Sequence, residues 1–96
     1  MNLRKLAKGQ ECQVREHGVC NFNPETVVLA HLNMSGISGR GIKSPDLLGA
    51  WCCSACHDYI DGRTNFDMHD SARKLAFLEG MARTQYQLIK QGYIKS

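Results

Sequence analysis

Cysteine and histidine side chains that bind metal ions lie close together in the second half of the chain. From Cys53 to His57 the sequence reads Cys-Ser-Ala-Cys-His, so two residues separate the thiols of Cys53 and Cys56 and a histidine follows directly. Zinc takes four tetrahedral ligands, commonly thiolates or imidazoles, and two thiols at this spacing supply half of such a site. Cys12 and Cys20 can supply the other half, although their spacing is longer than usual. The sequence therefore predicts a four-thiol zinc site.

Two further residues compete for places in this site. Cys52 directly precedes Cys53, and His17 lies near the first thiol pair. We prefer Cys53 because it gives the two-residue spacing to Cys56, and we expect Cys52 to be buried in an apolar run. The alternative interpretation is that the cysteines are small hydrophobic core residues, since free cysteine is among the most buried residue types.

The size and charge of the chain set its broad class. Its 96 residues predict a single domain, and the formal net charge of +3 permits a polyanionic partner without requiring one. Residues 1–10 lack the apolar region of a secretion signal, and no apolar run is long enough to cross a membrane. We therefore expect a cytoplasmic protein with no membrane partner. In the reducing cytosol, cysteines indicate metal ligands rather than disulfides. Nothing in the sequence indicates an oligomeric state.

Five regular elements are predicted, which together indicate an α+β fold. Residues 2–9 predict a short basic helix, residues 27–32 a strand, and residues 47–52 a helical turn that leads into a second strand. The thiol pair begins a helix over residues 54–61, and a longer helix begins near residue 70 and ends at Gly92. This last helix has one apolar stripe at spacings of three and four, which we expect to pack against the sheet and the preceding helix: Leu75, Leu78, Ala82, Tyr86 and Ile89.

The order of these elements resembles an HNH nuclease, which has the ββα-metal fold. The resemblance consists of a strand with Ala30-His31-Leu32, a basic glycine-rich loop, and a helix that begins with Cys53-x-x-Cys56-His57. Nearly the whole chain resembles, more closely, the YbcO family of small phage and prophage proteins, which are assigned as nucleases from their fold. The stretches that are similar to this family are residues 11–15, 18–21, 23–26, 29–31, 45–47, 53–58, 60–61 and 79–85.

The resemblance to HNH enzymes implies a role for individual residues. His31 matches the histidine on the first strand that acts as general base, and His57 matches a ligand of the catalytic divalent ion, such as Mg²⁺. Ala30 departs from the pattern, because many HNH enzymes have a metal-binding acidic residue or second histidine there. A second interpretation therefore stays open, namely a non-catalytic zinc module that binds nucleic acid or a phage or host protein. Four residues match the ligands of the structural zinc ion in four-thiol members of this fold: Cys12, Cys20, Cys53 and Cys56.

Asp61 is the carboxylate that we expect beside the catalytic ion. It follows His57 by four residues, so both side chains lie on one face of the predicted helix. It can complete the metal site or orient the imidazole ring. Asp58, Asp46 and His69 are weaker candidates for the same site.

The implied activity is metal-dependent hydrolysis of phosphodiester bonds in nucleic acid, which we expect to be DNA. Histidine titrates near neutral pH and can accept a proton from water, while a divalent ion binds the scissile phosphate. Arg40, Lys43 and Arg63 can contact backbone phosphates, which position the substrate without reading its sequence; the alternative is that they are ordinary solvated residues. Trp51 and Tyr59 can stack on bases, although Trp51 follows an apolar run and is expected in the core.

Overall fold

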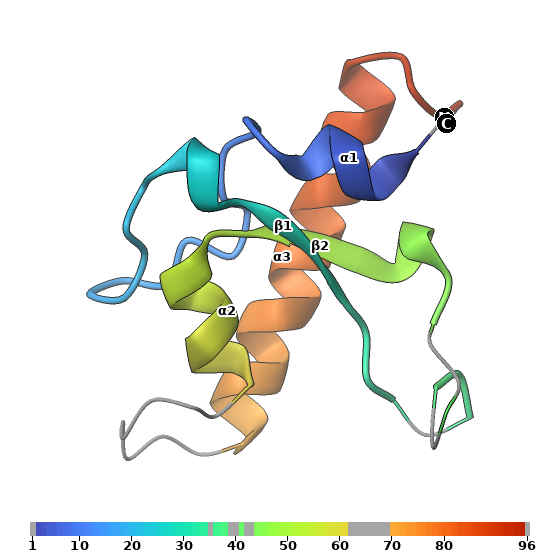
Figure 1. The fold of residues 1–96 in the computed structure, drawn as a ribbon. Coiled ribbons are helices and arrows are strands. Elements are labelled where there is room, and N and C mark those ends of the chain that lie inside the picture. Colours follow the sequence, from blue (N-terminus) through green and yellow to red (C-terminus); the bar gives the residue numbers. More distant parts are fainter. Residues whose placement is uncertain (1, 35, 39–40, 42–43, 62–69, 96) are drawn as a thin grey trace.

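Within the residues that the structure describes, a two-stranded antiparallel sheet and three α-helices form a small α+β fold. The computed structural model describes residues 2–34, 36–38, 41, 44–61 and 70–95. The strands are β1 (Val28–His31) and β2 (Gly49–Cys52), and each follows a one-turn 3₁₀ helix, η1 (Pro24–Thr26) or η2 (Asp46–Leu48). The long helix α3 (Asp70–Lys90) crosses behind the sheet, with α1 (Leu3–Ala7) above the sheet and α2 (Ser54–Ile60) below it in Figure 1.

The predicted strands are confirmed, and their register places His31 at one end of the sheet. His31 pairs with Gly49, and Val28 pairs with Cys52. Only glycine fits opposite His31, because a Cβ atom at position 49 would lie 2.7 Å from Leu29 Cδ1 and 2.9 Å from the Ala30 carbonyl oxygen. The close pairing fixes the backbone that carries His31.

Both shorter helices begin with a side-chain cap, which explains where they start. The Asn2 side chain accepts hydrogen bonds from the backbone N–H groups of the first turn of α1, and Cys53 accepts one from Cys56 at the start of α2. Side-chain acceptors of this kind satisfy N–H groups that have no partner within the helix. The cap on α2 thus brings a predicted zinc ligand to the helix start, with His57 one turn further on.

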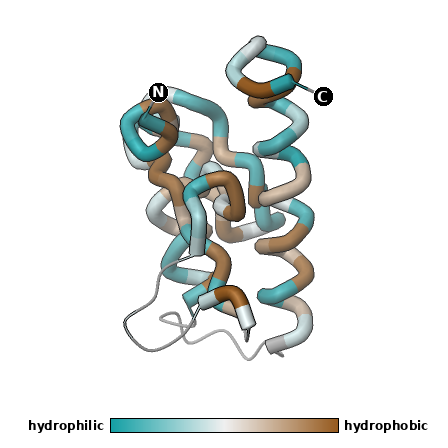
Figure 2. The backbone as a smooth tube through the Cα atoms, turned by 90° about the vertical axis from the view of Figure 1, so that its right-hand side faces the viewer, coloured by the Kyte–Doolittle hydropathy of each residue, from teal (hydrophilic) through white to brown (hydrophobic). Residues whose placement is uncertain are grey.

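The apolar stripe predicted for α3 is wrong. Leu75 and Tyr86 are 58% and 59% exposed, and the other members of the stripe are exposed as well. Hydrophobic positions recur along the whole of α3 between hydrophilic ones, so the hydropathy pattern does not single out one face (Figure 2). The buried face consists of other residues: Ala76, Phe77, Gly80, Thr84 and Leu88.

Small residues bring α3 close to the sheet and to the segment before it. The Thr84 hydroxyl accepts a hydrogen bond from the backbone N–H of Trp51 at 2.9 Å and donates one to the Gly80 carbonyl at 2.8 Å. Gly80 lies against Val14, where a Cβ atom would be 2.7 Å from Val14 Cγ2 and 3.1 Å from its Cα. Arg83, which is also on α3, donates to the Gln13 carbonyl at 2.8 Å. The helix therefore packs through glycine and threonine, which a hydrophobic pattern does not detect.

Replacement of Gly80 by alanine is expected to destabilise the protein by about 1 kcal/mol. Overpacking against Val14 costs about 1–3 kcal/mol, whereas the higher helix propensity of alanine returns about 1 kcal/mol. Denaturant unfolding measures the difference. Ala82→Gly, at an exposed position of the same helix, calibrates the propensity term alone, and a Gly80→Ala protein more stable than wild type would contradict the close packing.

The core includes both aromatic residues that were candidates for base stacking. Trp51 is 1% exposed, as expected, and Tyr59 is also 1% exposed. Neither ring is available to stack on a nucleic acid base. No helix within the described residues has the length and apolar character needed to cross a membrane.

Candidate functional site

The four thiols that the sequence predicts as zinc ligands come together beside the start of α2. Their sulfur atoms all lie within 4.8 Å of one another, and those of Cys53 and Cys20 are 3.7 Å apart. A tetrahedral zinc ion with Zn–S distances of ~2.3 Å separates its sulfur ligands by about 3.8 Å. The cluster therefore fits a metal such as zinc in the number, type and spacing of its ligands. It contains Cys12, Cys20, Cys53 and Cys56.

Left-handed backbone conformations direct N–H groups toward two of these sulfurs. Arg15 and Phe22 have φ angles of 50° and 55°, which are uncommon for residues other than glycine. The Arg15 N–H donates to Cys12 Sγ at 3.5 Å, and the Phe22 N–H donates to Cys20 Sγ at 3.4 Å. Hydrogen bonds to a thiolate stabilise its negative charge. The strained turns on the N-terminal side thus favour ionised sulfurs at the cluster.

The surroundings of the cluster shift the pKa values of two of its thiols in opposite directions. Hydrogen bonds from the thiols of Cys52 and Cys56 hold the pKa of Cys12 far below its ordinary value. Burial raises the pKa of the Cys20 thiol to about 11. These surroundings therefore favour the thiolate of Cys12 and the protonated thiol of Cys20. A bound metal ion removes this difference, because it deprotonates the thiols that coordinate it.

The two competing ligands of the sequence analysis lie outside the cluster. Cys52 is fully buried, as expected, and is not one of the four clustered thiols. His17 is exposed and is not part of the cluster either.

A cleft of about 800 Å³ lies between the end of β1, α2 and the start of α3. His31 lines it from β1, and His57 and Asp61 line it from the α2 side. Ala30 lines the cleft as well, at the position where the HNH resemblance leads one to expect a metal ligand. None of the four clustered thiols is among the lining residues, so the thiol cluster and the cleft are separate.

His57 and Asp61 face each other within the cleft. Nε2 of His57 and Oδ2 of Asp61 are 3.5 Å apart, as the spacing of four residues on a helix predicts. Their distance lets both groups contact the same cation, or lets the carboxylate orient the ring. Asp58, the weaker candidate, is half-buried and is not among the described residues that line the cleft.

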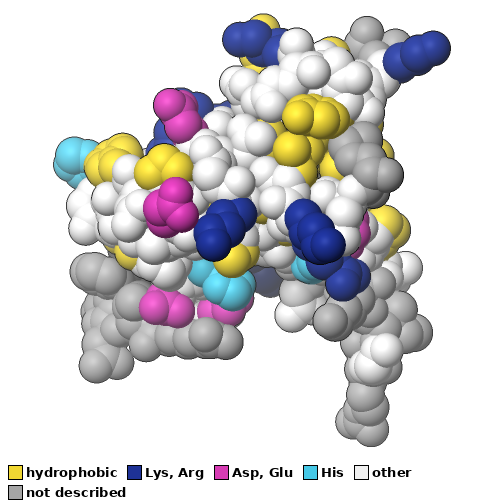
Figure 3. Space-filling model, turned by 45° about the horizontal axis from the view of Figure 1, so that its top comes forward, with side chains coloured by type: hydrophobic (Ala, Val, Ile, Leu, Met, Phe, Trp, Pro, Cys, Tyr) yellow, Lys and Arg dark blue, Asp and Glu magenta, His cyan; other side chains and the backbone are white. Residues whose placement is uncertain are grey.

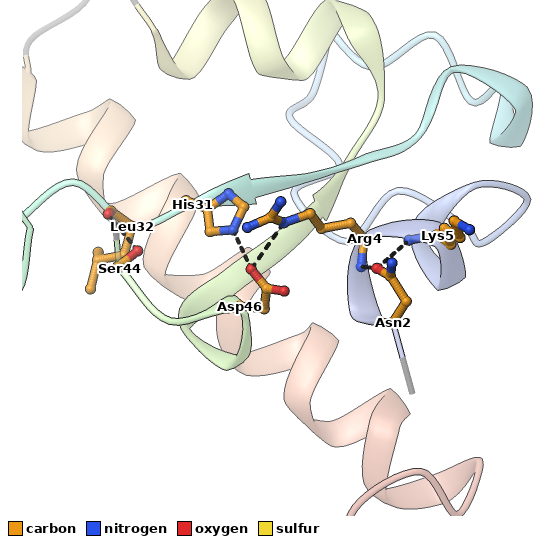
Figure 4. A network of polar contacts seen from close by, with 7 residues as sticks. All are labelled: Asn2, Arg4, Lys5, His31, Leu32, Ser44 and Asp46. Atoms are coloured by element: carbon orange, nitrogen blue, oxygen red, sulfur yellow. Dashed lines mark hydrogen bonds and ion pairs between the residues drawn. The ribbon is translucent and has the colours of Figure 1, made fainter. Parts of the chain in front are cut away.

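His31 makes a short hydrogen bond with Asp46, which the sequence analysis named only as a weaker candidate for the metal site. Its Nε2 atom lies 2.7 Å from Oδ1 of Asp46, and Nε of Arg4 donates to the same oxygen at 3.3 Å (Figure 4). The hydrogen bond with His31, followed by the contact with Arg4, holds the pKa of the Asp46 carboxyl below its usual value. The carboxylate is therefore ionised at neutral pH and fixes one edge of the imidazole ring.

A family model described as "Putative nuclease YbcO" matches residues 1–93. The chain belongs to the YbcO family. Two relatives bear the same name, one from Escherichia coli strain K12 and one from Enterobacteria phage 82. Each is 57% identical over 95 residues, which cover 99% of this chain and 98% of the relative. The recognition of this family from the sequence is confirmed.

A solved structure from Escherichia coli K-12, described as that of a putative bacteriophage protein, is similar to this YbcO-family chain throughout. The TM-score is 0.77 at 53% sequence identity, over 95% of this chain and all of the solved chain. The architecture described above is therefore shared with an experimentally solved protein.

Positive side chains of this YbcO-family protein also contribute to the cleft. Arg73 and Lys74, in the first turns of α3, are among its lining residues. On the face shown in Figure 3, dark blue lysine and arginine side chains lie beside cyan histidine side chains. Four residues named in the sequence analysis lie outside the described residues: Arg40, Lys43, Arg63 and His69.

Proposed function

We propose that this protein is a metal-dependent endonuclease of the HNH type, one domain over residues 1–96, that hydrolyses phosphodiester bonds in DNA. The observation that supports it most is that His31 and His57, from separate elements, line one cleft from which the four-thiol cluster is absent. This division leaves the thiols to a structural zinc ion and the histidines to the reaction. The nuclease names of the family and of its relatives agree with this proposal.

In the proposed reaction, His31 is the general base that takes a proton from water. Its side chain is 23% exposed, so the ring is anchored by its surroundings while one edge can meet solvent. General-base catalysis by a positioned side chain contributes about 10²–10⁴ in rate. The short hydrogen bond to Asp46 limits the orientations of the ring, which is a requirement for this role.

His57 and Asp61 would hold the catalytic ion, for which Mg²⁺ suits the setting. When bound, a divalent ion supplies positive charge to the scissile phosphate and the leaving oxygen. Magnesium keeps several water ligands and commonly uses one or two protein carboxylates together with substrate phosphates. A site with few protein ligands therefore fits this ion, even with Ala30 in place of a ligand. The clustered thiols suit zinc instead, because soft sulfur ligands do not select magnesium.

Arg73 and Lys74 are proposed to contact the phosphates of the bound strand. They lie on the α3 side of the cleft, across from the α2 side chains, so they can neutralise a backbone that enters it. Arg40, Lys43 and Arg63, which the sequence analysis suggested, remain proposed phosphate contacts. Such contacts hold the substrate and carry no base specificity.

Replacement of Lys74 by glutamine is expected to weaken DNA binding about eightfold at 0.1 M salt. The loss of one phosphate contact removes about 0.9 from the slope of log affinity against log salt. Fluorescence anisotropy with a labelled duplex, in chelator-free buffer without Mg²⁺, measures both quantities. Lys90→Gln is the matched control, because Lys90 is an exposed lysine in the last turn of the same helix. Equal losses in the two variants would show that Lys74 acts only through net charge.

Metal-dependent nicking of a supercoiled plasmid tests the proposed function directly. The zinc-loaded protein is expected to nick the plasmid when Mg²⁺ or Mn²⁺ is added, and the His31→Ala protein is expected to be inactive. Ala30 favours the second candidate, a zinc module that binds nucleic acid without cutting it. That candidate replaces the first if wild type and His31→Ala are equally inert while DNA still shifts on a gel.

A further inference from the structure

A single carboxylate oxygen contacts side chains from two separate parts of the chain. Oδ1 of Asp46 lies 2.7 Å from His31 Nε2 and 3.3 Å from Arg4 Nε. Arginine only donates hydrogen bonds, and an ionised carboxylate only accepts them. Because Asp46 is ionised, the short contact requires a proton on Nε2 of His31.

The position of this proton decides which nitrogen of His31 can act as a base. A neutral imidazole has one N–H group and one nitrogen with a free electron pair. If Nε2 carries the proton, Nδ1 carries the free pair. In Figure 4 the second ring nitrogen lies on the side of the ring away from Asp46. The accepting nitrogen is thus the one that does not face Asp46.

We propose that Asp46 is a positioning residue that holds neutral His31 in the tautomer with its proton on Nε2, so that Nδ1 accepts the proton from the attacking water. The assignment of the tautomer stands on the contacts alone. Its catalytic consequence rests on the proposed nuclease function.

The proton transfer that this arrangement allows is balanced. One O–H bond of water breaks as its proton binds Nδ1, and the water oxygen forms a bond to phosphorus. The bond between phosphorus and the leaving oxygen breaks, and that oxygen takes a proton from solvent. His31 is then an imidazolium with both nitrogens protonated, and its positive charge faces the Asp46 carboxylate, which stays ionised throughout.

Arg4 contacts the same carboxylate oxygen as His31 and helps to keep the carboxylate in place. It belongs to the first turn of α1, which the Asn2 side chain caps through the N–H groups of Arg4 and Lys5. The folded turn therefore presents the guanidinium to Asp46, which itself begins η2. His31, Asp46 and Arg4 thus connect β1, η2 and α1 at the edge of the cleft.

Nuclear magnetic resonance of the zinc-loaded, ¹⁵N-labelled protein tests the tautomer without any activity. Two-bond ¹H–¹⁵N correlations, recorded under conditions where the imidazole is neutral, identify the protonated nitrogen of each histidine. We expect His31 to be protonated on Nε2, with that proton shifted downfield by its hydrogen bond. A His31 protonated on Nδ1 in the wild-type protein overturns the proposal, whatever the nicking assay shows.

Variants of Asp46 separate positioning from a merely structural role. Asp46→Ala is expected to lose the downfield Nε2 proton and to lower kcat for nicking about 10- to 100-fold, the range for partners that orient a functional histidine, with KM changed less than twofold. Asp46→Asn keeps an accepting oxygen and is expected to retain the proton signal and part of the activity. The control is Glu25→Ala, since Glu25, like Asp46, is the acidic residue in the first turn of a one-turn helix, and it is exposed.

The outcomes distinguish this proposal from the proposed function. Asp46 does not position the base if Asp46→Ala nicks at the wild-type rate. The same conclusion follows if the variant's loss of activity is a change in KM and not in kcat. If the wild-type protein is inert but His31 has its proton on Nε2, the nuclease proposal fails and the tautomer assignment holds. If Asp46→Ala does not fold, the wild-type spectrum and Asp46→Asn decide the matter.

Discussion

Chelation of zinc from the loaded protein is expected to unfold the whole chain rather than only the segment around the thiols. The clustered sulfurs join the N-terminal segment, which contains Cys12 and Cys20, to the start of α2. Residues 10–23 contain no helix or strand, so few backbone hydrogen bonds hold this segment in place. Zinc binding in zinc-finger peptides is worth about 10–16 kcal/mol, against a total stability of about 5–15 kcal/mol for a typical protein. Loss of the ion therefore removes a free energy comparable to the whole free energy of unfolding.

Circular dichroism and zinc content measured on the same samples check this expectation. Cys56→Ala is expected to lose bound zinc and the cooperative unfolding transition, because it removes one of the four ligands and leaves only three thiols to bind the ion. Cys52→Ala is the matched control, since Cys52 is equally buried and adjacent to the cluster but is not part of it. It is expected to keep one zinc ion per chain. Its free energy of unfolding is expected to fall by only about 1 kcal/mol, because the substitution leaves a small cavity.

A third variant, Cys53→Ala, compared with Cys52→Ala, decides which of these two neighbouring thiols is the ligand. If Cys52→Ala releases zinc while Cys53→Ala retains it, the ligand assigned at this position is the wrong thiol. Full helical signal and a sharp transition after complete chelation would show instead that the apolar core suffices without metal.

The thiol cluster could be predicted from the sequence because metal coordination sets strict local requirements. At the beginning of a helix, two thiols separated by two residues indicate one half of a zinc site. Because zinc takes four ligands, Cys12 and Cys20 are then candidates for the other half. The strand that carries His31 was equally readable, since its β-branched and apolar residues form one short run between loop residues. Local chemistry of this kind does not depend on how distant elements meet.

The buried face of α3 could not be predicted from hydropathy because its packing depends on small residues. Gly80 and Thr84 allow the helix to approach β2 and Val14, and Thr84 satisfies the Trp51 N–H inside the core. Leucine and tyrosine at helical spacing suggested a different face, which is exposed. The orientation of α3 on the sheet depends on close packing and on a hydrogen bond. A pattern of apolar residues gives information on neither.

Asp46 was only a weaker candidate in the sequence, and Lys74 was not singled out, because their proposed roles arise from tertiary structure. Lys74 looks like any charged residue on a helix until the start of α3 meets α2 at the cleft. Asp46 had a usable signal: it lies three residues before Gly49, and the antiparallel register pairs Gly49 with His31. A strand pairing derived from the two short apolar runs would have placed the carboxylate near the histidine.

Replacement of His31 by alanine is expected to lower the rate of metal-dependent nicking by about 10²–10⁴, with zinc content and DNA binding unchanged. General-base catalysis accounts for a factor of this size. The side chain is partly exposed at the end of β1, so its loss leaves no large cavity in the core. The fold and the thiol cluster are therefore expected to persist, and the lower nicking rate is expected to be a decrease in kcat.

His17→Ala provides the matched control for this experiment, because His17 is an exposed histidine outside both the thiol cluster and the cleft. It is expected to nick at the wild-type rate. His57→Ala is expected to lose activity as well, but through the metal, so a higher concentration of Mn²⁺ should restore part of its rate and none of that of His31→Ala. If Mn²⁺ rescues the two variants equally, His31 acts as a metal ligand and not as the base, because the absence of a proton acceptor cannot be repaired by filling a metal site.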